Sequence, residues 1–271
     1  MKSTCLGVAA VALLTAPSIA APTEVDQRAA VTVLLRDTTG NPLGSGVVVG
    51  EASGGVWVAT NRHVVDGQKH LCVVAPDRPV RSALVMPAAS LKSTPPLDLA
   101  LLWWPAPQGT PQTVALIRAD PPRAQDLPLV VASGYPTPTQ ANRQAPNYTE
   151  ATGLLVPLLR QPLQGGFALA YTSEVQKGMS GGGVFLGNRL IGINGTHPNP
   201  LWPGQWFQAD GKAVPPELNA KLELVALGIP VSAIKQAINA TRLANTNGTA
   251  DLTDVKCLDQ PETPPTRSKT H

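Results

Sequence analysis

Short apolar runs separated by turn-forming residues are the main pattern along this chain. The runs are rich in Val, Ile and Leu, which is typical of β-strands bounded by turns. The clearest pair is 44–50 (GSGVVVG) and 55–60 (GVWVAT), between which Glu51–Gly55 is expected to reverse the chain as a hairpin. Further strands are expected at 30–35, 71–75, 82–86, 97–104, 114–117, 127–134, 152–159, 167–172, 184–186, 190–193 and 227–231.

One helical pattern occurs near the C-terminus. Residues 232–243 (SAIKQAINATRL) place Ile234 and Ile238 four positions apart, and Ser232 is suited to cap the helix. This spacing predicts a C-terminal helix. Before it, residues 198–219 are rich in Pro, Gly and Trp and predict a long surface insertion.

The pattern also indicates how the chain divides. Residues 120–126 (DPPRAQD) contain paired prolines, which exclude regular ladder pairing, so this segment is expected to connect two halves. We therefore expect an N-terminal domain at 21–122 and a C-terminal domain, including the helix, at 123–245. Residues 246–271 are polar and proline-rich, and a flexible tail is expected there.

Residues 1–20 have the pattern of a secretory signal peptide. Lys2 supplies the positive charge, 6–14 (LGVAAVALL) the apolar core, and 18–20 (SIA) a small-residue cleavage site. The alternative is a membrane anchor, but the apolar run is shorter than the ~20 residues that a spanning helix needs, and Pro17 interrupts it. After cleavage the protein is expected to be secreted or periplasmic, with no membrane segment.

Composition and charge exclude some classes of function. The chain is 43% hydrophobic and 14% charged, with a net charge of +3 and no basic run interleaved with aromatic residues. A nucleic-acid partner is therefore not expected. The 24 glycines and 28 prolines suit short strands joined by many turns.

The cysteines leave two alternatives open. Cys5 would leave with the signal, so the mature chain keeps Cys72 and Cys257. These form either one disulfide or two free thiols, and the sequence gives no distance that decides between them. With so few cysteines and only four histidines, a structural zinc site is not expected.

Ser180 is the strongest candidate for chemistry. It lies within the run 177–185 (KGMSGGGVF), where glycines permit a sharply turned, exposed backbone. In such a turn the N–H groups of Gly178 and Ser180 can point into one hole and stabilise the oxyanion formed when a serine attacks a carbonyl. The alternative is an ordinary flexible turn.

His63 and Asp98 are the candidates for the base and the acid that a catalytic serine requires. His63 follows a strand within 60–65 (TNRHVV), so its ring can project from the turn, although an isolated histidine there is more often structural. Asp98 lies between Leu97 and the apolar run that follows, where a buried carboxylate needs a partner because burying an unpaired charge is costly. The alternative for Asp98 is a solvated turn at the start of the strand.

These motifs, taken in order, resemble those of the trypsin-like (chymotrypsin-fold) serine endopeptidases. The likeness is to the exported bacterial and cyanobacterial-type branch and covers about residues 29–240. The matching segments are GSGV at 44–47, TNRHVV at 60–65, DLALL at 98–102, GMSGG at 178–182, LIGI at 190–193 and LGIPV at 227–231.

The resemblance implies an all-β fold of two six-stranded antiparallel β-barrels with a C-terminal helix. His63 and Asp98 would come from the first barrel and Ser180 from the second, with Gly178 and Ser180 forming the oxyanion hole. The implied activity is peptide-bond hydrolysis through an acyl-enzyme, without a cofactor, on protein or peptide substrates; protein inhibitors stay open as partners. The alternative is an inactive, exported binding protein that kept the barrels.

Two positions depart from the family pattern. Vertebrate members carry an aspartate directly before the serine, which pairs with a newly cut N-terminus to assemble the oxyanion hole. Here that residue is Met179, which cannot form an ion pair, so removal of the signal should suffice for activity. Gly183 replaces the usual proline and should affect the stiffness of the strand more than the chemistry.

Substrate selection is left open between two sets of residues. Glu174 lies six positions before Ser180, where the pocket floor of trypsin-like members is found, and it would there favour Lys or Arg; alternatively it faces solvent. The stretch 192–197 (GINGTH), with Asn194, Gly195 and His197, should form the substrate-binding edge. Asn194 or His197 would instead favour an acidic side chain.

Overall fold

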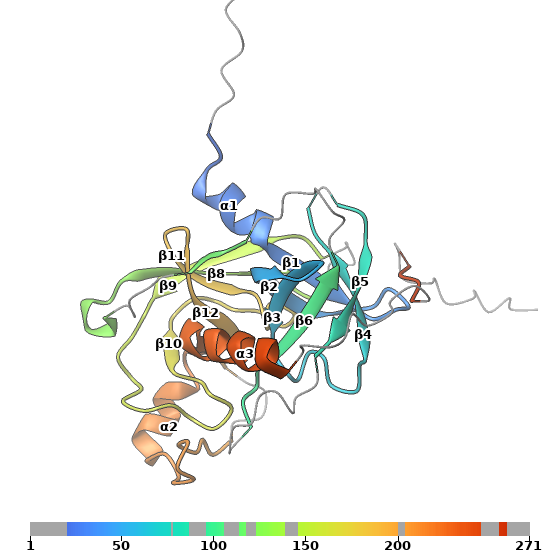
Figure 1. Cartoon of the computed structure of the whole chain (residues 1–271). Coiled ribbons are helices and arrows are strands. Elements are labelled where there is room, and N and C mark those ends of the chain that lie inside the picture. The colour runs from blue at the N-terminus through green and yellow to red at the C-terminus, as the bar shows by residue number, and fades with distance from the viewer. Residues whose placement is uncertain are drawn as a thin grey trace, which may run out of the picture.

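Two β-sheets lie side by side, and a C-terminal helix lies across them (Figure 1). The computed structural model describes residues 21–76, 78–86, 96–105, 114–117, 123–138, 146–199, 204–244 and 255–258. The expected signal peptide at 1–20, most of the expected tail at 246–271 and residues 120–122 of the expected connector lie outside the described residues.

The first sheet is the closed six-stranded barrel that the resemblance implied. Its strands pair in the order β1-β2-β3-β6-β5-β4, and all the pairs are antiparallel. The expected hairpin is confirmed as β2 and β3. The strands are β1 (Thr32–Arg36), β2 (Pro42–Ala52), β3 (Gly55–Thr60), β4 (His70–Val74), β5 (Arg81–Val85) and β6 (Ala100–Pro105).

Alternation along the barrel strands divides their apolar side chains between two cores, since successive side chains of a strand point to opposite faces. Val56 and Val58 of β3 lie in the barrel interior, a core that contains residues of every strand of the barrel. Trp57 and Ala59 of the same strand pack in a second core, shared with the other sheet. Because both faces are buried, these strands are apolar throughout rather than alternating.

The second sheet curls into a half-barrel, so the two sheets together form the double-barrel arrangement that the resemblance implied, although this sheet has seven strands where six were expected. Its main order is β10-β13-β12-β11-β8-β9, and the short β7 pairs with β12 in parallel. The two ends of this path meet through the bridge between Leu155 and Tyr171 and the hydrogen bond from Thr172 N–H to Leu154 O (3.0 Å). The strands are β7 (Leu116–Ile117), β8 (Leu129–Gly134), β9 (Thr149–Leu154), β10 (Leu169–Tyr171), β11 (Gly183–Leu186), β12 (Arg189–Thr196) and β13 (Ala226–Pro230).

The strand β7 crosses the expected boundary between the halves. It lies before residue 123, yet it pairs with β12 of the second sheet. The preceding residue, Ala115, donates its N–H to Val48 O of the first barrel at 2.8 Å. Residues 114–117 therefore contact both sheets.

Three α-helices accompany the sheets within the described residues. The helix α3 (Val231–Ala244) is the expected one, but it begins before Ser232, which lies inside its first turn. The helix α2 (Pro216–Leu222) forms within the expected insertion. The helix α1 (Glu24–Val31) was not expected, although Thr23 and Asp26 form a capping box at its start. None of these helices is long and apolar enough to cross a membrane, within the part of the chain that the structure describes.

The helix α3 seals the core between the two sheets. Its Ile234, Ala237 and Ile238 are buried with Trp57 of the barrel and Ile229 of the second sheet. At its other end, Arg242 donates a hydrogen bond to Glu51 O (2.9 Å) in β2, which is a strand of the first barrel. The last helix therefore fastens the second half to the first.

A disulfide joins Cys72 and Cys257 and decides between the two alternatives that the sequence left. Cys72 lies in the middle of β4, and the Cα atoms of the pair are 5.7 Å apart.

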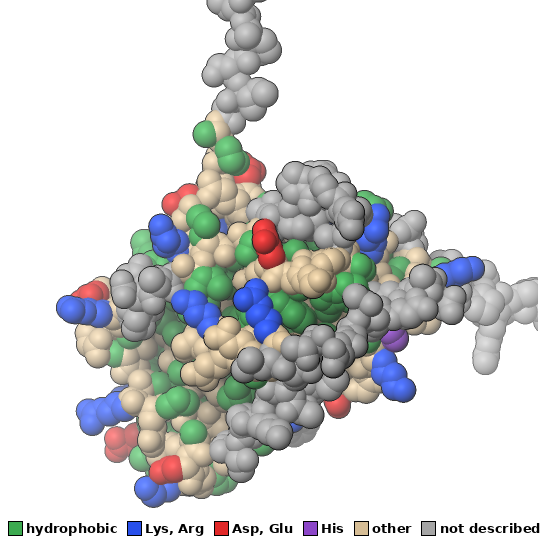
Figure 2. Space-filling view, in the orientation of Figure 1, with side chains coloured by type: hydrophobic (Ala, Val, Ile, Leu, Met, Phe, Trp, Pro, Cys, Tyr) green, Lys and Arg blue, Asp and Glu red, His purple; other side chains and the backbone are tan. Residues whose placement is uncertain are grey.

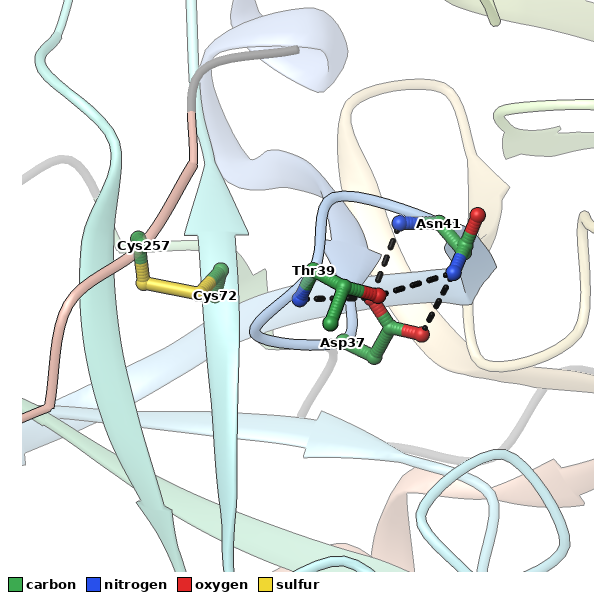
Figure 3. The surroundings of a disulfide bond; sticks show 5 residues. All are labelled: Asp37, Thr39, Asn41, Cys72 and Cys257. Carbon is green, nitrogen blue, oxygen red and sulfur yellow. Dashed lines mark hydrogen bonds between the residues drawn. A yellow bond between two sulfur atoms is a disulfide. The ribbon is translucent and has the colours of Figure 1, made fainter. Parts of the chain in front are cut away.

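Figure 3 shows the bond beside the turn at Asp37, whose carboxylate accepts hydrogen bonds from Thr39 and Asn41. These bonds hold the pKa of Asp37 below its usual value, although burial acts in the opposite direction.

We expect the double variant Cys72→Ser/Cys257→Ser to lower the free energy of unfolding by about 2–4 kcal/mol, because the cross-link restricts the unfolded chain. Denaturant unfolding of the variant and of the parent protein measures the difference. Protein beginning at residue 21 should also show no titratable thiol when it is denatured without reductant. Two free thiols, or identical unfolding midpoints, would contradict the disulfide.

Candidate active site

Asp98 contacts His63 at two points. Its Oδ1 accepts the backbone N–H of His63 at 3.0 Å, and its Oδ2 lies 2.8 Å from Nδ1 of the ring. The His63 side chain is 51% exposed, whereas that of Asp98 is 18% exposed. The carboxylate thus fixes the ring from its inner side, and the opposite ring nitrogen, Nε2, is left without a hydrogen bond within the described residues.

The position of Asp98 is itself set by groups from both halves. Asn61, which is fully buried, donates from Nδ2 to Asp98 O at 3.0 Å. From the second half, Gly165 O accepts the Asp98 N–H at 2.8 Å, and Leu97 forms a bridge with Gly165. The sequence did not identify Asn61 or Gly165 as site residues. Asn61 could have been found, because a polar residue directly after a buried strand needs a partner. Nothing in the sequence indicates Gly165.

The loop that carries Ser180 lies against the first barrel. Ser180 O accepts the N–H of Ser45 in β2 at 2.9 Å, and Ser45 Oγ donates to Gly178 O at 2.8 Å. Gly181 has a φ of +82°, and a Cβ at that position would lie 2.2 Å from Ser45 O. Only glycine permits this approach, so the glycines of the serine motif are required here by space as well as by backbone conformation.

The hydroxyl of Ser180 lies 3.5 Å from Gly195 O, a long contact. Both Ser180 and His63 belong to the described residues, and no hydrogen bond joins them. The structure therefore pairs His63 with Asp98 and places the serine loop on the barrel from which they come. Catalytic hydrogen bonds often tighten only when a substrate binds.

Among residues 178–182, which form the serine loop, two backbone N–H groups have no acceptor within the described part of the chain. These are the N–H groups of Gly178 and Ser180, whereas those of Met179, Gly181 and Gly182 donate to Gln176 O, Asn194 O and Met179 O. Unpaired N–H groups on a loop that carries a serine can bind an oxyanion. They are the pair that the sequence indicated.

The candidate specificity residues differ in their surroundings. Glu174 and His197 are exposed, and His197 Nδ1 lies 2.9 Å from Pro198 O. Gly195 is buried, and its carbonyl faces Ser180. Asn194 is also buried, and its carboxamide binds groups of the protein itself. Its expected contact with substrate is therefore replaced by internal hydrogen bonds.

The described residues contain no group of three or more His, Cys, Asp or Glu side chains suited to bind a metal ion. On the face shown in Figure 2, basic side chains are scattered and do not gather into one stripe.

The variants Gly181→Ala and Gly211→Ala form a matched pair, because both glycines have a positive φ, +82° and +87°. A Cβ on Gly181 would also lie 2.3 Å from Thr60 Oγ1, whereas one on Gly211 would meet no described atom within 4 Å. We expect Gly181→Ala to lower the free energy of unfolding by about 1–3 kcal/mol more than Gly211→Ala does. Denaturant unfolding of both variants tests this, and equal losses would contradict the close approach of the loop.

Comparison with known proteins agrees with this geometry. A solved structure with a similar fold is that of the serine endoprotease from Yersinia pestis, with a TM-score of 0.54 and 21% sequence identity; the match covers 82% of this chain and 68% of that one. Comparison with curated protein sequences finds no significant match. The profile of the trypsin-like peptidase domain matches residues 44–193, which include His63, Asp98 and Ser180. The chain therefore belongs to the family of trypsin-like peptidase domains.

Proposed function

We propose that this protein is an exported serine endopeptidase in which Ser180 is the nucleophile, His63 the base and Asp98 the residue that orients the base. The observation that carries the proposal is the two-point contact of Asp98 with His63. A carboxylate on Nδ1 favours the tautomer in which Nε2 accepts a proton, and it stabilises the ring once that proton has arrived.

In the proposed reaction, Ser180 Oγ rotates from Gly195 O towards Nε2 of His63 and attacks the substrate carbonyl. The Oγ–C bond forms as the hydroxyl proton moves to His63, and the same proton then passes to the leaving amine as the C–N bond breaks. Water then attacks the acyl carbon as one of its protons passes to His63, the Oγ–C bond breaks, and that proton returns to Ser180 Oγ as the acid product leaves. The unpaired N–H groups of Gly178 and Ser180 would bind the negative oxygen of the tetrahedral intermediates.

Export is part of the proposal. The signal-like pattern of residues 1–20 supports it, and so does the Cys72–Cys257 disulfide, because disulfides persist mainly in oxidising compartments. The protein would then act in the periplasm or outside the cell, on protein or peptide substrates.

We expect Ser180→Ala to abolish labelling by a fluorophosphonate and Asp98→Asn to lower kcat by about 10⁴-fold, because the ring of His63 then loses its orienting carboxylate. Both effects are measured on protein beginning at residue 21: covalent labelling gives the first, and turnover of a peptide taken from a diverse pool gives the second. The matched control is Asp66→Asn, an exposed aspartate three residues after His63, which should keep full activity. A parent protein that neither cleaves peptides nor takes the label would instead support an inactive binding protein.

For specificity we favour an acidic residue before the scissile bond. Gly195 O lies beside Ser180 Oγ, so the end of β12 borders the nucleophile, and His197 follows two residues later. Pro198 O can only accept, so Nδ1 of His197 carries a proton, and Nε2, on the other side of the ring, donates to a carboxylate only when the ring is protonated at both nitrogens. Glu174 and His197 are both exposed, so water screens both charges, and the preference for His197 rests on its place directly after β12.

We expect peptides with Glu before the scissile bond to be cleaved faster than matched Ala peptides. His197→Gln should reduce that kcat/KM ratio by about tenfold, the size of one charge-assisted hydrogen bond, and Glu174→Gln should leave it unchanged. Profiling with a peptide library provides the measurement. A preference for Lys or Arg that Glu174→Gln removes would reverse this assignment.

A further inference from the structure

The direction of a backbone N–H is set by the carbonyl of the same peptide group. A trans peptide is planar, so its C=O and N–H point in opposite directions. For the N–H of Gly178, the relevant carbonyl is Lys177 O, which accepts from Thr137 N–H at 2.8 Å. For the N–H of Ser180, it is Met179 O.

Met179 O is held by two donors on the side away from the Ser180 N–H. One is the N–H of Gly182, at 3.0 Å within the loop itself. The other is Nδ2 of Asn194, at 3.1 Å, which comes from β12. The side chain of Asn194 is therefore the tertiary contact that fixes the plane of the Met179–Ser180 peptide.

The carboxamide of Asn194 is held in a single orientation. It is fully buried, and Nδ2 also donates to Ser133 O of β8 at 2.8 Å. Two carbonyl oxygens face the same end of the amide, so that end must be the NH₂ group. The other end, Oδ1, accepts the hydroxyl of Tyr171 at 2.8 Å, and burial raises the pKa of Tyr171 so that the hydroxyl keeps its proton.

The residue beside the nucleophile is anchored by apolar contacts. The side chain of Met179 has no exposed surface and packs with Val130, Ile191 and other apolar residues of a separate core that belongs to the second sheet. Apolar packing fixes the position of a side chain but exerts little control over the rotation of the next peptide, because it is not directional. The hydrogen bond from Asn194 supplies that direction.

We propose that Asn194 is a positioning residue for the oxyanion hole: by holding Met179 O, it aims the N–H of Ser180 at the oxygen that becomes negative. The proposal rests on the proposed peptidase function. In vertebrate members of the family, the aspartate before the serine orders the oxyanion hole through an ion pair. Here that residue is Met179, and the neutral side chain of Asn194 orders the hole instead.

The test compares two ligands that differ only in whether they form an oxyanion. Ser180 Oγ adds reversibly to the carbonyl of a peptidyl trifluoromethyl ketone as its proton passes to His63, and the carbonyl oxygen becomes negative in the hole. The matching peptidyl alcohol binds without this addition. In Asn194→Leu we expect kcat to fall about 10- to 100-fold and the Ki of the ketone to rise by a similar factor. The effect should not exceed that of removing one oxyanion-hole donor, because the Ser180 N–H is misdirected rather than lost. The KM and the Ki of the alcohol should change less than about twofold.

Asn219→Leu is the matched control. Asn219 is also an asparagine whose carboxamide holds backbone groups, Trp206 N–H and Gly204 O, but it lies in α2. It should change neither Ki. If Asn194→Leu does not fold, Tyr171→Phe removes the hydroxyl that holds Oδ1 and should shift the ketone alone, by a smaller factor.

The outcomes separate this inference from the proposed function. An active parent whose Asn194→Leu variant binds both ligands as before, or loses both equally, overturns the role of Asn194 and leaves the peptidase intact. Unchanged binding of the ketone by Tyr171→Phe overturns it if only that variant folds. A parent protein without turnover or labelling overturns both.

Discussion

The fit of the serine loop against the first barrel is the constraint on which the rest of the site depends. Ser180 O takes the N–H of Ser45, and a Cβ on Gly181 would collide with Ser45 O and Thr60 Oγ1. Thr60 ends β3, and His63 follows in the next turn, so the backbone contact that seats the loop also sets how far the hydroxyl lies from the imidazole. The glycines around the serine therefore serve the meeting of the two halves as much as the local turn.

Where the sequence predicted structure well, the signal was local. Runs such as 55–60 and 100–105 are apolar on both faces because each face enters a different core, and β-branched residues between glycines and prolines were enough to place them. The contexts of His63 and Asp98 were informative for the same reason, since each stands directly beside a strand. Their hydrogen bond follows from the pairing of β3 with β6, which brings Thr60 opposite Ala100.

What the sequence could not predict depends on contacts between distant segments. The helix α1 is short, and its buried Arg28 is stabilised by a bidentate ion pair with Glu150, 122 residues away. Asn194 looked like a substrate contact because it lies in the strand beside the serine, but a strand has two faces, and only the fold shows that its side chain points inwards. The disulfide stayed open for a similar reason, because spacing along the chain carries no information about distance.

The position of α3 makes the two sheets mutually dependent during folding. The core that joins them contains Trp57 from the first barrel, Ile229 from the last strand and Ile234 from the helix that ends the second half. A nascent chain released only as far as its first barrel would expose one apolar side of that barrel to water. The two sheets of this protein are thus not separable modules, because the core between them is complete only after the chain has been made as far as α3.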